Sequence, residues 1–235
     1  MALYSREIWA VIPARGGSKS IPYKNLVKVS NQTLIERTVI AGRGSELLSR
    51  IFVSTEDAKI ASHCKQLDVE LHNRPGCLAK DDTPIDLVLR QFLKDIADKE
   101  GIYPLAIVLL QPTSIFIRPQ DIDECIKPFF DDDSWNSVQT VTLCAHNAHA
   151  HNQRILLEEG ISFAFPNERK QNYNKQRKPK HYLFGNVVAT RSIAILSGAG
   201  VFAEPSYGIE IPNLYAFDLD NAVDLALAEQ VANLV

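Results

Sequence analysis

Three cations surround a pair of glycines near the N-terminus. Arg15 precedes Gly16 and Gly17, and Lys19 and Lys24 follow them. Because glycine lacks Cβ, the backbone here can adopt positive φ, approach an anion closely and offer its N–H groups to it. Arginine can bind two phosphate oxygens at once, and each lysine adds a point charge. The segment therefore predicts a site for a polyphosphate ligand.

Two acidic side chains near the C-terminus form a second candidate site. In the extended stretch predicted over residues 215–220, alternation places Asp218 and Asp220 on one side and turns Phe217 and Leu219 to the other. Two neighbouring carboxylates repel each other unless a cation or hydrogen-bond donors lie between them. The pattern predicts a divalent-metal site. The alternative is that Asp220 only caps the helix that follows.

Polar residues also stand at the edges of two other predicted elements. Gln111 ends the most apolar stretch of the chain, residues 105–110. An amide at this position can form a buried turn or face a ligand, and the residues alone leave both readings open. Asp82 or Thr83 can cap a helix that has Pro84 at its first position.

Short apolar runs alternate with amphipathic segments along most of the chain. The predicted strands cover residues 8–12, 50–54, 69–71, 105–110, 137–143 and 187–190, and the predicted helices cover 33–43, 57–67, 84–100, 120–130, 192–196 and 222–234. This alternation predicts an α/β fold of three layers, with a mostly parallel sheet covered on both faces. Ligands of such sheets bind at the carboxyl ends of the strands, where the glycine segment would lie.

The alternation breaks between about residues 145 and 183. Two short alternating runs, 154–157 and 161–165, flank Glu158-Glu159-Gly160 and predict a hairpin. The segment predicts a small insertion within a single domain that spans residues 1–235. The cations after the hairpin are either solvated or reach an anionic group of a neighbouring subunit. They are Lys170, Lys175, Arg177, Lys178 and Lys180.

The composition is that of a globular protein. The chain has 235 residues, of which 46% are hydrophobic, so one sizeable core is expected. Its net charge of −3 gives no general attraction to nucleic acid or anionic membranes. The sequence contains no run of about 18 apolar residues, which is the length that a membrane-spanning helix needs. The four cysteines are widely spaced and predict reduced thiols. We therefore expect a cytoplasmic protein that binds neither nucleic acid nor membranes.

Three segments of the sequence resemble one family. Residues 12–26, Ile-Pro-Ala-Arg-Gly-Gly-Ser-Lys-Ser-Ile-Pro-Tyr-Lys-Asn-Leu, are similar to the N-terminal signature of the acylneuraminate cytidylyltransferases, which make CMP-sialic acid and related CMP-sugars. Leu-Leu-Gln-Pro-Thr-Ser at 109–114 and Asp-Leu-Asp at 218–220 resemble the second and third signatures. The resemblance implies a Rossmann-like nucleotide-diphospho-sugar transferase fold, CTP as substrate, Mg²⁺ and an acidic sugar as acceptor. It also implies a homodimer formed through the insertion, which would build part of the acceptor pocket as well.

The resemblance also implies roles for individual residues. The catalytic residues would be Arg15, Lys24, Asp218 and Asp220, of which the two aspartates would hold Mg²⁺. The nucleotide-binding residues would be Ala14, Arg15, Gly16, Gly17, Lys24, Asn25, Arg74, Thr83, Asp86 and Gln111. Arg15, Lys24 and Arg74 would neutralise the triphosphate. Helix capping explains Thr83 and Asp86 equally well.

The acceptor half departs from the family pattern. The sialic-acid enzymes usually show an arginine and then Arg-Pro-Asn-Gly before the next strand, whereas this chain keeps the glycine as Gly185 but not the second arginine or the Pro-Asn. The acceptor could therefore be another 3-deoxy-2-ulosonic acid or a phosphonate. A nucleotidyltransferase that uses UTP or GTP and a sugar 1-phosphate is a further alternative, which Gln-Pro-Thr-Ser at 111–114 disfavours. An inactive subunit that only binds a nucleotide is another.

Overall fold

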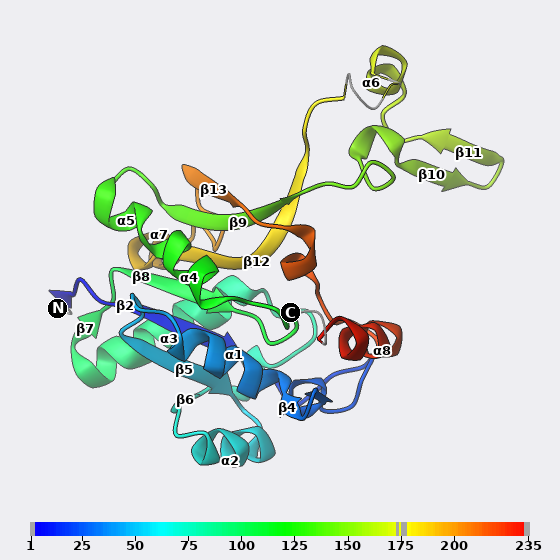
Figure 1. Cartoon of the computed structure of the whole chain (residues 1–235). Coiled ribbons are helices and arrows are strands. Elements are labelled where there is room, and N and C mark those ends of the chain that lie inside the picture. Colours follow the sequence, from blue (N-terminus) through cyan, green and yellow to red (C-terminus); the bar gives the residue numbers. More distant parts are fainter. Residues whose placement is uncertain (1–2, 173, 175–177, 233–235) are drawn as a thin grey trace.

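A seven-stranded sheet forms the centre of the chain, as the computed structural model in Figure 1 shows for residues 3–172, 174 and 178–232. The strand order is β13-β9-β12-β8-β2-β5-β6. The bounds are β2 (Ile8–Pro13), β5 (Arg50–Thr55), β6 (Glu70–Asn73), β8 (Ala106–Leu110), β9 (Ser137–Leu143), β12 (Tyr182–Arg191) and β13 (Ser206–Glu210). Only β12 runs antiparallel to its neighbours in this sheet. The prediction of a mostly parallel sheet is confirmed.

Helices cover both faces of the sheet because the side chains of β2 alternate between two apolar clusters. Ile8, Ala10 and Ile12 pack with residues of α1, α2 and α4, while Trp9 and Val11 pack with residues of α3 and α7 on the opposite face. The predicted α/β fold of three layers is confirmed. The helices are α1 (Leu34–Arg43), α2 (Ala58–Gln66), α3 (Ile85–Glu100), α4 (Pro119–Ile126), α5 (Pro128–Asp131), α6 (Pro166–Gln171), α7 (Ser192–Ser197) and α8 (Ala222–Val231).

Shorter elements surround this framework. Outside the main sheet, the strand pairs among the described residues are β1 (Leu3–Tyr4) with β7 (Ile102–Tyr103), β3 (Lys28–Val29) with β4 (Gln32–Thr33), and β10 (Arg154–Leu157) with β11 (Gly160–Phe163). The described residues also include the short 3₁₀ helices η1 (Lys24–Leu26), η2 (Gly76–Leu78), η3 (Ala150–Asn152) and η5 (Asn213–Ala216).

Local side-chain chemistry accounts for the start of α1 but not for that of α3. Thr33 and Glu36 form a capping box in which each side chain accepts a hydrogen bond from the main-chain N–H of the other. The cap predicted for α3 is wrong, because Pro84 is the N-cap residue and no side chain caps this helix. Asp82 and Thr83 precede the position from which a side chain reaches the amides of the first turn.

Two other predicted elements have different bounds. The helix predicted over residues 120–130 is divided into α4 and α5 at Pro128, because proline lacks an N–H group and its ring clashes with the preceding turn. The strand predicted over residues 187–190 is the inner part of the ten-residue β12. The first three residues of β12 are exposed, so they lack the apolar pattern of a buried strand.

A third apolar cluster joins the N-terminal loop to the C-terminal segment. Ile21 and Val29, which follow β2, share this cluster with Phe116, Leu219 and Ala228. Leu219 is fully buried there. The cluster therefore fixes the segment around Leu219 next to the loop that follows the first central strand.

β12 continues beyond the sheet into an arm formed by β10, β11 and α6, which extends away from the main body in Figure 1. The pairing of β12 with β9 shifts register between Phe184 and Val188. Inside this irregularity the Thr140 hydroxyl accepts hydrogen bonds from the N–H groups of Asn186 and Val187. A Cβ on Gly185 would lie closer than 3.0 Å to the Thr140 side chain, so glycine is required where the strand leaves the sheet.

Apolar and cationic side chains both mark the arm. Leu156 at the hairpin is 83% exposed, and its neighbours on β10 are exposed as well. Lys178 Nζ and Arg169 Nη1 both donate to Asn152 Oδ1, at 2.6 and 3.0 Å. Of the predicted cationic cluster, Lys175 and Arg177 lie outside the described residues.

Two global features agree with the composition. Cys64, Cys77, Cys125 and Cys144 are free thiols. Within the described ranges, none of the helices combines the length and the apolar character that crossing a membrane requires.

Candidate active site

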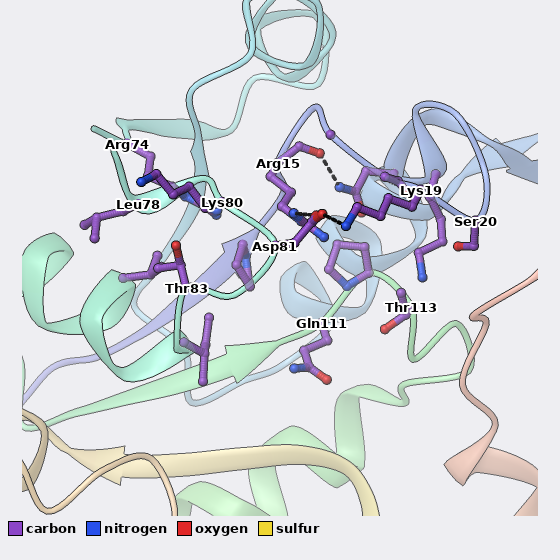
Figure 2. Close-up of a pocket in the computed structure, with 18 residues that line it drawn as sticks. Arg15, Lys19, Ser20, Arg74, Leu78, Lys80, Asp81, Thr83, Gln111 and Thr113 are labelled. Atoms are coloured by element: carbon purple, nitrogen blue, oxygen red, sulfur yellow. Dashed lines mark hydrogen bonds and ion pairs between the residues drawn. The ribbon is translucent and has the colours of Figure 1, made fainter. Parts of the chain in front are cut away.

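A cavity of about 510 Å³ lies at the carboxyl ends of β2 and β8, where those strands open into loops. This is the edge at which ligands of parallel sheets bind. Figure 2 shows its wall. Of the predicted site residues, Arg15, Gly17, Lys24, Asn25, Arg74, Thr83 and Gln111 line the cavity. Ala14, Gly16, Asp86, Asp218 and Asp220 are not part of its lining.

Main-chain contacts hold the loop after β2 in place. The N–H of Ala14 donates to the carbonyl oxygen of Ser54 at 3.0 Å and continues the pairing with β5. The side-chain amide of Asn25, which is 9% exposed, donates to the carbonyl oxygen of Arg15 at 3.0 Å. Asn25 therefore closes the loop on itself and presents Arg15 to the cavity. Ala14 is fully buried and supports the loop from below.

The predicted role of the glycine backbone needs correction. Neither Gly16 nor Gly17 has positive φ. The N–H of Gly16 donates to Glu56 Oε1 at 2.8 Å and is thus already occupied inside the protein. A Cβ on Gly16 would lie closer than 3.0 Å to three atoms of the Asp57 side chain, so glycine is needed for close packing and not for an unusual backbone angle.

Lys24 connects the loop with the C-terminal acids. Its Nζ lies 3.2 Å from Asp220 Oδ1 and donates to the carbonyl oxygen of Leu219 at 3.1 Å. The Lys24 side chain is 16% exposed and lines the cavity, whereas the Asp220 side chain is 74% exposed. The cationic loop and the acidic segment therefore meet at one edge of the cavity, although 196 residues separate the two partners in sequence.

The acidic segment has the predicted alternation in its second half. Leu219 is buried while Asp218 and Asp220 are exposed, although residues 215–216 form part of η5 and not of an extended stretch. The alternative that Asp220 caps α8 is wrong. Asn221 is the N-cap, and its side chain accepts hydrogen bonds from the first-turn amides. Asp220 is therefore not used as a helix cap.

The Asp218 carboxyl has a pKa above its ordinary value. Partial desolvation is the main cause, and repulsion from Asp220 and Asp224 adds to it. A hydrogen bond from the Thr113 side chain and the charge of Lys24 act in the opposite direction. The neighbouring carboxylates thus repel each other in the free protein, as the pattern of the sequence predicts.

Arg74 lines the cavity and is 5% exposed. Its Nη2 donates to the carbonyl oxygen of Ser54 at 2.6 Å, which leaves other N–H groups of the guanidinium for a ligand. Desolvation lowers the pKa of Arg74, Glu56 raises it, and the charge of Arg15 lowers it further. Because Arg74 and Arg15 lie near each other, an anion between them would relieve their repulsion.

Thr83 and Asp86, both carried over from the resemblance, lie in different surroundings. Thr83 lines the cavity, as does Gln111 at the end of β8. Asp86 Oδ1 instead accepts a hydrogen bond of 2.6 Å from the N–H of Val201. Asp86 thereby ties the start of α3 to the loop after α7, which is a structural contact.

Sequence reasoning missed two acids beside the loop. The Asp81 carboxylate lies between Arg15 Nη1 and Lys19 Nζ, which Figure 2 shows, and the distance from Asp81 Oδ2 to Lys19 Nζ is 2.6 Å. Glu56 Oε1 accepts from Gly16, while Glu56 Oε2 is buried without a hydrogen-bond partner among the described residues. No local pattern identifies either acid, because their partners are 40 to 66 residues away in sequence.

The donor set fits a magnesium ion that shares its ligands with a phosphate. Mg²⁺ is usually held by one or two carboxylates together with substrate phosphates and water. Asp218 and Asp220 are two exposed carboxylates that share one cationic neighbour, Lys24, and desolvation together with the charges of Asp220 and Asp224 keeps the pKa of Asp218 raised despite it. In the described part of the chain, no group of three or more His, Cys, Asp or Glu side chains is arranged to hold a metal.

The comparisons with known proteins agree with this geometry. The family model described as Cytidylyltransferase matches residues 9–194. The chain belongs to the cytidylyltransferase family. Its match covers the sheet from β2 to β12 and includes the loops after β2 and β8 that line the cavity.

Relatives within the family are distant in sequence. The chain is 25% identical to the N-acylneuraminate cytidylyltransferase of Streptococcus agalactiae over 91% of its own length, and it spans about half (50%) of that relative. It is 26% identical to the CMP-N,N'-diacetyllegionaminic acid synthase of Legionella pneumophila, with 97% of both chains covered.

Solved structures support the fold. A CMP:2-keto-3-deoxy-manno-octonic acid synthetase, whose structure is a complex with CTP, superposes with a TM-score of 0.73 at 15% identity and covers 97% of this chain and 100% of its own. A 4-diphosphocytidyl-2C-methyl-D-erythritol synthase from Anaerococcus prevotii superposes with a TM-score of 0.67 at 12% identity, with 97% of this chain and 96% of its own covered. The nucleotidyltransferase fold is therefore shared across members of very low identity.

The two glycines of this cytidylyltransferase-family loop are predicted to respond differently to substitution. Gly16→Ala pushes Asp57 away from its position as the N-cap of α2, where its carboxylate accepts from two amides. We expect a loss of about 1 kcal/mol or more in the free energy of unfolding. Gly17→Ala, whose Cβ would meet nothing within 4 Å, should leave stability unchanged or raise it by about 0.4–1 kcal/mol. Urea denaturation of both variants checks this, and equal losses would contradict the assignment.

Asp218→Asn is predicted to raise the melting temperature of the metal-free protein at pH 7. Folding raises the pKa of this carboxyl above its unfolded value, near 3.8, so the folded state prefers the protonated form. As the pH rises through the folded pKa, the carboxyl must ionise in the folded protein, and the free energy of unfolding falls. The gain should be small, because the residue is exposed and solvent screens its charge. The gain should vanish at pH 3, where the carboxyl is protonated in both states. The same gain at both pH values would contradict the electrostatic explanation.

Proposed function

We propose that the chain is a cytidylyltransferase that transfers CMP from CTP to an acidic sugar of the 3-deoxy-2-ulosonic acid class and releases pyrophosphate. The observation that carries the proposal is the contact of Lys24 with Asp220 at the edge of the cavity. It brings together a cationic loop suited to a triphosphate and a pair of acids suited to a divalent cation. A metal-bound nucleoside triphosphate has the charge pattern that fits between them.

The triphosphate side of the site is built from rigid parts. Arg15 is presented by the loop that Asn25 closes, Lys24 is held by its contact with the Leu219 carbonyl, and Arg74 is anchored to Ser54. Such fixed cations stabilise the charge that develops when pyrophosphate leaves. Membership of the cytidylyltransferase family supports cytosine as the base, and Thr83 and Gln111 supply polar groups in the same cavity.

The acidic side of the site would direct the attack. The acceptor hydroxyl oxygen forms a bond to the α-phosphorus as the bond from that phosphorus to the oxygen that bridges it to the β-phosphate breaks. Pyrophosphate leaves with that oxygen, and the hydroxyl proton passes to solvent. Asp218 and Asp220 would hold a divalent cation, which supplies positive charge to the α-phosphate and the attacking oxygen. Their repulsion in the free protein favours the binding of that cation.

The names of similar proteins support the proposed acceptor class, and the exposed side chains of the arm support the proposed dimer. One relative and one solved structure of the same fold, each covered over nearly its full length, act by their names on a legionaminic acid and on 2-keto-3-deoxy-manno-octonic acid, both of which are acidic sugars. In this chain we assign residues 145–183 to a subdomain that contacts a second copy. The exposed leucines and isoleucines of β10 and β11 support this assignment, since such side chains are usually covered by a partner.

The activity test is pyrophosphate release with each of the four nucleoside triphosphates against a panel of acidic sugars, sugar 1-phosphates and phosphonates. We expect turnover with CTP, a divalent cation and at least one ulosonic acid. Asp220→Asn should lower kcat/KM by on the order of 10²–10³-fold, because a charge that stabilises the transition state is lost. The matched control is Asp98→Asn, which removes an exposed carboxylate on α3. CTP binding without turnover on any acceptor would contradict the proposal, as would full activity of Asp220→Asn.

The dimer has its own test. Leu156→Asp places a charge on the most exposed leucine of the hairpin and should shift the chain towards the monomer in sedimentation velocity. Leu227→Asp, which charges a half-exposed leucine on α8 far from the hairpin in sequence, is the control and should leave the sedimentation coefficient unchanged. A wild-type chain that is monomeric at tens of micromolar would contradict the assignment.

A further inference from the structure

The Asp81 carboxylate lies where a phosphate group would be expected. Its two oxygens face two different cations of the loop after β2: Oδ1 pairs with Arg15 Nη1, and Oδ2 pairs with Lys19 Nζ at 2.6 Å. A carboxylate that binds two cations through two oxygens makes the same contacts as two oxygens of one phosphate. Asp81, Arg15 and Lys19 all line the cavity of the proposed active site (Figure 2).

Electrostatics prevents Asp81 and a triphosphate from using these cations together. A polyphosphate bound to Arg15 would place several negative charges next to the Asp81 carboxylate, and like charges at such distances repel strongly. The ion pairs also hold the pKa of Asp81 below its ordinary value, with Lys19 as the larger cause and Arg15 as the smaller one. Asp81 is therefore ionised at neutral pH and competes as an anion.

The segment that carries Asp81 can respond to its release. Asp81 follows η2 and precedes α3, within a turn in which the N–H of Thr83 donates to the carbonyl oxygen of Lys80. The Asp81 side chain is 40% exposed, and Lys80 next to it also lines the cavity. Loss of the two surface ion pairs costs little, because exposed pairs contribute little to stability. Exchange with a ligand therefore requires no unfolding of the core.

We propose that Asp81 occupies the polyphosphate subsite of the free protein and exchanges with a phosphate group of the nucleotide or with pyrophosphate. The inference deepens the proposed function and rests on it. Asp81 acts as a positioning residue that weakens polyphosphate binding, and so it aids release of the pyrophosphate product. No covalent step is involved, because one anion replaces another at the same two cations.

Asp81→Asn tests the exchange, with Asp82→Asn as a matched control. Both variants remove one exposed carboxylate from adjacent positions, but Asp81 alone of the two is paired with Arg15 and Lys19. Isothermal titration with inorganic pyrophosphate should show binding to Asp81→Asn that is tighter than to wild type by on the order of tenfold. The change for Asp82→Asn should stay within about threefold, as expected of a charge outside the contact. Equal effects of the two variants, or weaker binding by Asp81→Asn, would overturn the proposal.

A second measurement uses the wild-type chain. The pKa of the Asp81 carboxyl, followed by ¹³C NMR, should be low in the free protein and should rise when pyrophosphate is saturating, because the carboxylate then loses its cations and faces an anion. An Asp81 pKa that stays low with pyrophosphate bound would overturn the exchange.

The two proposals fail in different ways. If folded wild-type protein and Asp81→Asn bind neither pyrophosphate nor CTP, the proposed function is overturned and this inference falls with it. If wild type binds both ligands and the two variants behave alike, the inference about Asp81 alone is overturned.

Discussion

Mutual repulsion among cations is the constraint that organises the cavity. The folded chain brings Arg15, Lys19 and Lys24 to one wall, where their charges oppose one another. Asp81 pairs with the first two, and Asp220 pairs with Lys24. Since exposed ion pairs contribute little free energy, these internal partners can be exchanged for the phosphates of a ligand. In the proposed function, these carboxylates therefore occupy the places that phosphates of the nucleotide would take.

Buried contacts determine where those charges lie. The loop after β2 follows a strand that is packed on both faces, and Glu56 and Asn25 fix its main chain from two sides. The apolar cluster that contains Leu219 holds the neighbouring acids against the loop. Positions within about 0.5 Å matter for catalysis, and rigid elements provide them better than free loops do. Apolar packing in the third cluster therefore has an electrostatic consequence at the site.

Much of the fold and part of the site could be predicted from the sequence because their signals are local. Alternating apolar runs identified the central strands, and the spacing of Asp218, Leu219 and Asp220 indicated which side chains are buried. Local sequence patterns gave wrong predictions where a residue is constrained by another residue far away in the sequence. Gly16 has a local pattern that suggests unusual φ, but its actual constraint is the side chain of Asp57 some 40 residues away. The helix break at Pro128 is local, and proline chemistry could have identified it.

Local sequence patterns also fail to identify acidic side chains whose partners lie far away in the sequence. Asp81 stands in a polar run that resembles a helix start, but Pro84 is the N-cap residue of α3. The Asp81 side chain takes no part in capping and instead pairs with Arg15. Only the folded sheet brings the loop after β2 next to the segment before α3. Pairings of this kind therefore become visible only in the folded chain.

The two halves of the molecule differ in how strongly their geometry constrains their chemistry. The cavity lies at the ends of central strands whose positions the packed layers fix, whereas the arm leaves the sheet at the irregularity in β12. At that point Gly185 lies too close to Thr140 to accept a larger residue, so the exit of the strand is fixed even though the residues beyond it are exposed. Side chains of the arm can then vary without disturbing the loop after β2. This separation accounts for a chain that keeps the nucleotide signatures of its family and departs from them in the segment assigned to the acceptor.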